Sequence, residues 1–185
     1  MFAHRCPPWI GYLLISPLRR LIQDPHKLLA PHVTAGMTVV EPGPGMGFFT
    51  LELARLAGPS GRVIAIDIEP KMLAKLEQRA RKAGVAENIV LRQPKGESLN
   101  VDDLANTVDF VPAIAVVHEL PNRALFFQEM YGALRGGGKL LLLEPPGHVK
   151  RPLWEKTLAS AYDAGFQRDS DPKARRFHAA LLRKP

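Results

Sequence analysis

Cysteine is almost missing from this sequence, because Cys6 is the one copy among 185 residues. A single thiol cannot form an intramolecular disulfide, which excludes a disulfide-stapled secreted scaffold and makes a cytoplasmic protein the expectation. The same shortage excludes a zinc site built from paired cysteines, and no two histidines have metal-ligand spacing on one element. We therefore assign no metal site.

Long apolar runs are also missing. The most apolar N-terminal stretch, Trp9 to Ile15, is far shorter than the ~20 residues that span a bilayer, and no small-residue cleavage site of a signal peptide follows it. We expect residues 1–35 to form two short helices that act as a lid over one edge of the fold. A membrane-surface role, with Arg19 and Arg20 at the lipid headgroups, is the less favoured alternative.

Composition supports one soluble core, since 46% of the residues are hydrophobic and 23% are charged. The net charge of +7 would favour anionic partners such as nucleic acid, but its location weakens that reading. Residues 150–185 contain nine basic and four acidic residues, whereas residues 36–149 contain twelve and thirteen. The basic excess therefore belongs to the ends of the chain.

From residue 36 onward, short β-rich apolar runs alternate with helical patterns, which is typical of βαβ units. The expected strands are 38–41, 62–67, 89–92, 108–117, 139–144, 166–169 and 176–182, and the expected helices are 46–57, 70–84, 122–134 and 150–164. The connection between the last two strands is too short for a crossover helix, so the last strand should be antiparallel. The sequence thus predicts an α/β fold, with residues 36–185 forming one doubly wound, seven-stranded, mostly parallel sheet.

The most informative segment is a glycine-rich loop between the first strand and the first helix, Glu41-Pro42-Gly43-Pro44-Gly45-Met46-Gly47. Glycines at such a turn let a ligand approach the backbone closely, although a simple strand-to-helix turn is the structural alternative. A dinucleotide fingerprint would need its third glycine at position 48, which is Phe48. The pattern present is ExGxGxG instead.

Two carboxylates define the ligand further. Asp67 ends the second strand, where a carboxylate can accept hydrogen bonds from both hydroxyls of a ribose, and capping of the next helix is its alternative role. Glu41 ends the first strand, where it would repel a phosphate but favour an ammonium or a sulfonium. An adenosine joined to a zwitterionic amino acid with a sulfonium is S-adenosylmethionine.

Over residues 36–182 the chain resembles the class I S-adenosylmethionine-dependent methyltransferases. The resemblance is closest to their small-molecule branch, which includes quinone-biosynthesis enzymes. The motifs that carry it are the Glu41 to Gly47 loop, Ile66-Asp67-Ile68 with Pro70 to Leu73, Val108-Asp109-Phe110, His118-Glu119-Leu120, and Leu134 to Leu140.

The resemblance implies roles for individual residues. Glu41 and the backbone of Gly43, Pro44, Gly45 and Gly47 would hold the methionine part of the cofactor, Asp67 would bind the ribose, and Ile68 and Met72 would flank the adenine. Many relatives have Gly-Asp-Ala where this chain has Pro94-Lys95-Gly96, and a lysine cannot accept a hydrogen bond from the adenine amino group. Backbone carbonyls near Gly96, or Glu97, would replace that aspartate, and Ala113 in the fourth strand completes the cofactor set.

His118 follows the fourth strand and is the candidate general base, while a helix-entry role with a satisfied hydrogen bond is the alternative. Glu144 and His148 follow the fifth strand at the same edge. The predicted function is methyl transfer to a small, partly apolar acceptor, with the oligomeric state left open. Two alternatives remain, a non-catalytic cofactor-binding protein and a nucleic-acid methyltransferase. The latter would use the basic residues Arg168, Lys173, Arg175, Arg176, Arg183 and Lys184.

Overall fold

A computed structural model describes residues 23–172, 174 and 177–185. The chain divides into two compact units at the peptide bond between Gln93 and Pro94. We call them the N-terminal unit and the C-terminal unit. The predicted lid falls mainly on residues 1–22, outside the described residues, and its described remainder contains the short helix α3 (Pro25–Leu29).

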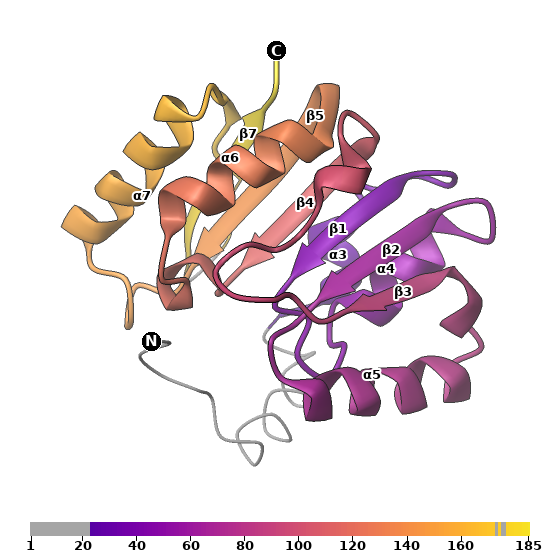
Figure 1. The fold of residues 1–185 in the computed structure, drawn as a ribbon. Coiled ribbons are helices and arrows are strands. Elements are labelled where there is room, and N and C mark those ends of the chain that lie inside the picture. Colours follow the sequence, from indigo (N-terminus) through magenta and orange to yellow (C-terminus); the bar gives the residue numbers. More distant parts are fainter. Residues whose placement is uncertain (1–22, 173, 175–176) are drawn as a thin grey trace. The chain divides into compact units, whose positions relative to one another are not determined.

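The N-terminal unit alternates parallel strands with helices (Figure 1). Its strands are β1 (Thr38–Pro42), β2 (Arg62–Ile66) and β3 (Ile89–Arg92), its helices are α4 (Thr50–Ala57) and α5 (Pro70–Lys82), and a 3-10 turn, η1, covers Ala86–Asn88. The strands lie in the order β3-β2-β1, with Val40 opposite Ile64. Both of these residues are buried, which explains why the strands read as continuous apolar runs.

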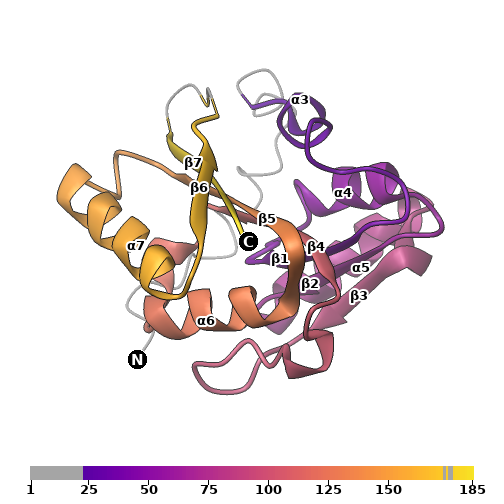
Figure 2. The ribbon, with the colours of Figure 1, turned by 90° about the horizontal axis from the view of Figure 1, so that it is seen from above.

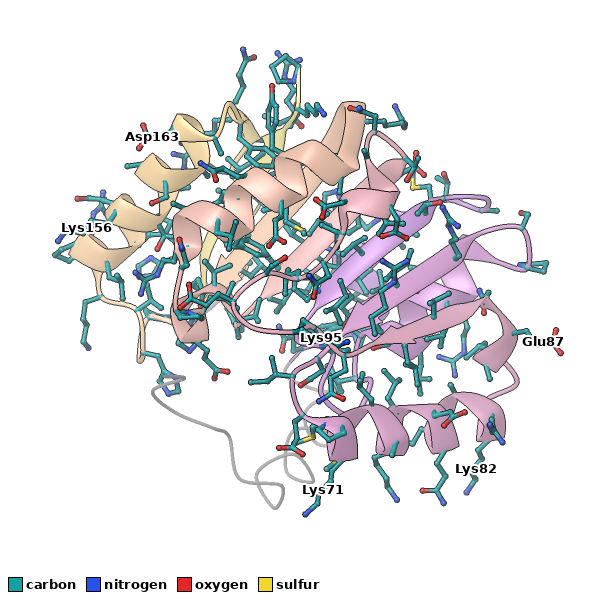
Figure 3. All side chains as sticks on the ribbon, viewed as in Figure 1. Lys71, Lys82, Glu87, Lys95, Lys156 and Asp163 are labelled. Atoms are coloured by element: carbon teal, nitrogen blue, oxygen red, sulfur yellow. The ribbon has the colours of Figure 1, made fainter. Side chains whose placement is uncertain are left out.

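Helix α5 shows how the sequence builds this unit. Glu69 caps its first turn by accepting a hydrogen bond from the Lys71 N–H, and Pro70 occupies the first helical position, where a proline is tolerated. One face of the helix is buried: Met72, Leu73, Leu76 and Ala80. Lys71 and Lys82, at its two ends, project away from the strands (Figure 3). The helix therefore has one apolar face for the core and one charged face for water.

The C-terminal unit carries four strands in the order β4-β5-β7-β6. They are β4 (Val108–Ile114), β5 (Leu134–Glu144), β6 (Gln167–Ser170) and β7 (His178–Arg183), and the helices are η2 (Asp102–Leu104), η3 (Val117–Glu119), α6 (Arg123–Ala133) and α7 (Arg151–Asp163). Strand β4 is parallel to β5, whereas β7 is antiparallel to both β5 and β6. Figure 2 shows β7 beside β6 and α7 beside α6.

These strands confirm the predicted α/β class with a seven-stranded, mostly parallel sheet and a reversed last strand. Most boundaries lie within two residues of the prediction, but two in the first and fourth βα units differ by more. Helix α4 begins at Thr50 and not at 46, because the glycine loop continues as turns through Phe49. Strand β4 ends at Ile114, and η3 replaces its expected continuation to 117.

The largest correction concerns three consecutive glycines. We expected a helix to end at 134 and a strand to begin at 139, but Gly136 to Gly138, between those two positions, lie inside β5, which begins at Leu134. The Gly137 N–H donates to the Lys184 carbonyl, and the Lys184 N–H donates to the Gly138 carbonyl, each at 2.9 Å. A Cβ on Gly138 would lie 2.9 Å from the Arg135 carbonyl oxygen, so a bulge that only glycine fits keeps this segment in the sheet.

None of the described helices is long and apolar enough to cross a membrane.

Candidate functional site

The glycine loop joins β1 to α4 in the N-terminal unit, and three of its glycines have a left-handed backbone. Their φ angles are +66° at Gly43, +54° at Gly45 and +82° at Gly47. A Cβ on Gly47 would collide with Leu76 Cδ1 of α5, whereas a Cβ on Gly45 would meet nothing within 4 Å. Gly47 is therefore needed for packing, and Gly45 leaves open space above the backbone, as a ligand-binding turn requires.

Asp67 follows β2 and connects two turns of this unit. Its Oδ2 accepts a hydrogen bond from the Gly45 N–H at 3.0 Å, and its Oδ1 accepts one from the Glu69 N–H at 2.9 Å. Burial raises the pKa of the Asp67 carboxyl, while these two backbone donors oppose that rise. Each carboxylate oxygen has a second lone pair, so Asp67 can hold the loop and still accept hydrogen bonds from a ligand.

Glu41, in β1, is a buried carboxyl with an unused oxygen. Only 4% of the residue is exposed, and its Oε2 is buried without a hydrogen-bond partner among the described residues. Burial raises its pKa to about 8, against the lowering effect of the Thr50 hydroxyl, and the nearby charge of Asp67 adds to the rise. A buried carboxyl in this state gains most from a ligand that brings a positive charge.

The loop, Asp67 and Glu41 together fit S-adenosylmethionine. Its α-ammonium and sulfonium are cations that a carboxyl can pair with, and its ribose offers two hydroxyl donors. Glu41 Oε2 has an unused acceptor site, Asp67 is a carboxylate with spare lone pairs, and Gly45 leaves the approach open. A phosphate would gain nothing from the buried carboxyl of Glu41, which would repel it once ionised.

The two residues expected beside adenine differ in exposure. Ile68 directly follows Asp67 and is 38% exposed, so its side chain is accessible to a ligand. Met72 is 7% exposed and lies on the buried face of α5. The Gln93 side chain donates to the Ile68 carbonyl at 3.2 Å, which attaches the turn after β2 to the end of β3. The Ile68 side chain is thus more accessible to an adenine than the Met72 side chain.

The remaining cofactor candidates lie in the C-terminal unit. Gly96 and Glu97 are exposed residues of a turn that Glu129 of α6 holds in place, by accepting from the Ser98 hydroxyl at 2.5 Å and from the Leu99 N–H at 3.0 Å. Ala113 is fully buried in β4. Their part in cofactor binding stays a prediction.

His118, the candidate base, lies in η3 of the same unit and is paired with Glu144 at the end of β5. His118 Nδ1 lies 2.6 Å from Glu144 Oε2, and the His118 backbone N–H donates to Glu144 Oε1 at 3.2 Å. The hydrogen bond to Glu144 raises the pKa of the imidazole, and burial opposes the rise. The ring of His148 meets that of His118 edge to face, with centroids 5.6 Å apart.

The structure brings together residues that the sequence analysis treated separately. Glu144 and His148 were expected only at the same sheet edge as His118, and they contact it. Thr50, beside Glu41, was not anticipated at all; the signal was its position three residues after the last loop glycine, in the first turn of α4. Within the described part of the chain, no cluster of three or more metal-ligating side chains occurs.

The chain is similar to known methyltransferases. The model of a methyltransferase domain family matches residues 33–166. The ubiquinone/menaquinone biosynthesis C-methyltransferases UbiE of Enterobacter sp. strain 638 and of Escherichia coli O1:K1 are each 33% identical over 132 residues. That similarity covers 71% of this chain and 50% of each relative, so the chain spans about half the length of these curated relatives.

Solved structures agree with the sequence relatives. A SAM-dependent methyltransferase from Aquifex aeolicus superposes with a TM-score of 0.84 at 25% identity, over 97% of this chain and 98% of that one. A methyltransferase structure from Methanococcus maripaludis, at 16% identity, has a TM-score of 0.77 over 96% and 90% of the two chains, which supports the fold alone. The chain therefore belongs to the methyltransferase domain family, with the fold of the class I S-adenosylmethionine-dependent enzymes.

Proposed function

We propose that this chain catalyses methyl transfer from S-adenosylmethionine to a small, partly apolar acceptor. The observation that carries the proposal is the pair of carboxyls beside the glycine loop. Asp67 is fixed by the Gly45 and Glu69 N–H groups, and Glu41 keeps a buried oxygen without a partner among the described residues. A phosphate-binding loop would place backbone donors, and not an acid, where this chain places Glu41, whereas an acid at the position of Asp67 suits any ribose.

In this proposal, the N-terminal unit binds the cofactor through its own residues. Asp67 accepts hydrogen bonds from the ribose hydroxyls, and Glu41 pairs with the ammonium of the methionine moiety. Gly43, Pro44, Gly45 and Gly47 form the backbone cradle, and Ile68 covers one face of the adenine. The bound cofactor supplies an electrophilic methyl group on its sulfonium, so catalysis rests on holding the acceptor in line with that group.

The acceptor class rests on the relatives. Proteins that are 33% identical to this chain are named ubiquinone/menaquinone biosynthesis C-methyltransferases, which suggests a small aromatic acceptor for this chain as well. The fold by itself does not settle the reaction, because a [4+2]-cyclase, SpnF, shares it at a TM-score of 0.71. Methyl transfer must therefore be tested directly, and not inferred from binding.

The nucleic-acid alternative is not favoured, because the described basic residues of the C-terminus are occupied within the chain. Arg168 pairs with Asp171, and Arg183 donates to Gln167. The Lys184 ammonium donates to Asn106 Oδ1 and to two backbone carbonyls, each at 2.8 Å. Such contacts leave these side chains poorly disposed to bind phosphates. Lys173, Arg175 and Arg176 lie outside the described residues.

The proposed function is tested in two steps. Calorimetry measures binding of S-adenosylmethionine, and transfer of a radiolabelled methyl group to naphthols and naphthohydroquinones measures the reaction. We expect binding and transfer, both reduced at least tenfold in Asp67→Ala and unchanged in Glu87→Gln. Glu87 is an exposed carboxylate after α5 (Figure 3), so that variant removes a charge far from the loop. Binding without transfer to any of these acceptors would favour the cofactor-binding alternative.

A further inference from the structure

The side chain of Arg79, on α5, contacts the glycine loop of the same unit. Its Nη1 donates a hydrogen bond to the backbone carbonyl of Met46, 33 residues earlier in the chain. Met46 is 6% exposed and precedes α4, which begins at Thr50. A buried carbonyl outside a helix or strand needs a partner, because leaving it unpaired costs free energy. Arg79 supplies a charged donor, and hydrogen bonds from charged donors are stronger than those from neutral ones.

Hydrogen bonds fix the loop backbone at three successive residues. The Gly45 N–H donates to Asp67 Oδ2 at 3.0 Å, and the Gly47 N–H donates to a carbonyl within the loop at 2.9 Å. Between them, the Met46 carbonyl accepts from Arg79. The two side chains have complementary tasks, since Asp67 fixes an N–H and Arg79 fixes a C=O. The peptide groups of this segment therefore cannot rotate without breaking one of the three contacts.

A second side chain of α5 contacts the next residue of the loop. Leu76 lies three positions before Arg79, so the two side chains are neighbours on the helix surface. A Cβ on Gly47 would collide with Leu76 Cδ1, and Leu76 is fully buried. The helix itself follows the Glu69 N–H, which donates to Asp67 Oδ1 at 2.9 Å. The same helix thus connects the proposed ribose carboxylate with the loop.

The loop depends on such contacts because glycine is the least restricted residue. Gly43, Gly45 and Gly47 all have left-handed φ angles, and a glycine can leave that region at little cost. A loop without these contacts would adopt several conformations in the free chain, and a ligand would have to order it at a cost in affinity. The alternative role for Arg79 is packing alone, in which the loop keeps its conformation without the guanidinium.

We propose that Arg79 is a positioning residue for S-adenosylmethionine, which holds the glycine loop in its ligand-binding conformation through the Met46 carbonyl. This inference rests on the proposed function and deepens it, because the loop is the proposed cradle for the methionine part of the cofactor. Arg79 acts on the ligand through the loop. Its loss should therefore change the order of the free loop and the affinity for the cofactor.

The first test needs no ligand. Hydrogen exchange at the Gly45 and Gly47 amides, measured by NMR, reports how often the loop opens, because both N–H groups are hydrogen-bonded in the loop. Arg79→Met has a side chain of similar length without a donor. Both amides should exchange about tenfold faster in this variant, since it loses a hydrogen bond from a charged group. Unchanged exchange at both amides would overturn the inference.

Two further variants control the first test. Arg79→Lys keeps a charged donor and should restore most of the protection at both amides. Arg81→Met is the matched control on the same helix, because the Arg81 side chain is 72% exposed and pairs with Glu77 at 2.5 Å. It removes the same charge without a contact to the loop, so loop exchange and cofactor affinity should equal those of the parent chain.

Calorimetry separates positioning from packing. In Arg79→Met, well below its Tm, the dissociation constant of S-adenosylmethionine should rise about tenfold. Saturating cofactor should return the exchange of both loop amides to the rate of the cofactor-bound parent chain. A lower Tm with an unchanged dissociation constant would show packing alone and would overturn the inference. If Arg79→Met does not fold, Arg79→Gln, with its shorter neutral donor, takes its place with the same expected directions.

The outcomes separate this inference from the proposed function. A parent chain that does not bind S-adenosylmethionine would break the proposed function, whereas amide exchange in the free chain would still decide whether Arg79 orders the loop. Binding by the parent chain with the same affinity in Arg79→Met would overturn the inference and leave the proposed function standing. Faster loop exchange together with weaker binding in Arg79→Met, and neither in Arg81→Met, is the result that we expect.

Discussion

Asp67 Oδ2 accepts a hydrogen bond from the backbone N–H of Gly45 at 3.0 Å, although the two residues are 22 positions apart in the chain. The carboxylate that we propose for the ribose is therefore also the group that holds the glycine loop. Because the other oxygen of Asp67 is held by the Glu69 N–H at 2.9 Å, the side chain is oriented before any ligand binds. Preorganisation of this kind reduces the entropy lost on binding.

Asp67→Ala should weaken the binding of S-adenosylmethionine and of S-adenosylhomocysteine more than tenfold. It removes the ribose acceptors and frees the loop, and a hydrogen bond to a charged group contributes about 1.5–3 kcal/mol. Calorimetry measures both affinities, with Glu87→Gln as the surface-charge control. Affinities within twofold of the parent chain would show that Asp67 does not contact the ligand.

Glu41→Gln should stabilise the free protein more at pH 8 than at pH 5. The pKa of Glu41 is raised from 4.5 to about 8 in the folded chain. The contribution of Glu41 to the free energy of unfolding is therefore complete below pH 4.5 and is lost as the pH rises through 8. A glutamine is neutral at every pH, so the variant does not lose stability in this way as the pH rises. Thermal melts should show the Tm difference, variant minus parent, growing from pH 5 to pH 8, by about 2–4 °C for each kcal/mol.

The same variant tests ligand pairing, because a neutral glutamine side chain in place of Glu41 cannot form an ion pair with an ammonium. Its affinity for S-adenosylmethionine should fall at least tenfold at pH 7.5. In the parent chain, binding should release a proton, since a cation lowers the pKa of Glu41 below its free value of about 8. Calorimetry in two buffers of different ionisation enthalpy measures the released proton. Equal heats in both buffers would argue against pairing at Glu41.

Gly47→Ala and Gly45→Ala should show that Gly47 is needed for packing within the unit and Gly45 for cofactor binding. Both place an alanine in the left-handed region, at roughly 1–2 kcal/mol. In Gly47→Ala the new methyl group also collides with the fully buried Leu76, so its Tm should fall further. In Gly45→Ala the methyl group enters open space, so cofactor affinity should suffer more than stability. Equal effects of the two variants on Tm would contradict this division.

Glu129→Ala should loosen the turn that carries Gly96 and Glu97. Glu129 accepts hydrogen bonds from Ser98 and Leu99, which anchor this turn to α6. Hydrogen exchange of the amides at 96–100 should become faster, while that of α5 stays unchanged. If the turn contributes to adenine binding, added cofactor should slow the exchange of these amides in the parent chain.

Features that local sequence patterns encode could be predicted, whereas side-chain contacts that depend on the folded structure could not. The glycine loop and Asp67 were predictable, because a strand-loop-helix pattern and a carboxylate at the next strand end follow from local patterns. The pairing of His118 with Glu144, 26 residues apart, depends on the conformation of η3 and the end of β5, which no local pattern encodes. The Glu41 oxygen that has no partner in the described part of the chain is likewise a property of burial and not of spacing.

The glycines at 136–138 show a place where secondary-structure propensity does not predict the observed structure. Three consecutive glycines predict a turn, because glycine weakens strands. In this chain Gly137 and Gly138 hydrogen-bond with the backbone of Lys184, and Leu134 pairs with Val108. Sheet pairing overrides the local preference, so a helix-to-strand boundary moved by several residues while the order of elements stayed as predicted.

Calorimetric titration of the chain with S-adenosylmethionine, S-adenosylhomocysteine and NAD tests the central claim most directly. We predict that both adenosyl ligands bind with one site per chain, that Asp67→Ala weakens both more than tenfold, and that NAD does not bind. Binding of NAD without binding of S-adenosylmethionine would contradict the account, because it would show that the acidic loop of Glu41 and Asp67 accepts a pyrophosphate.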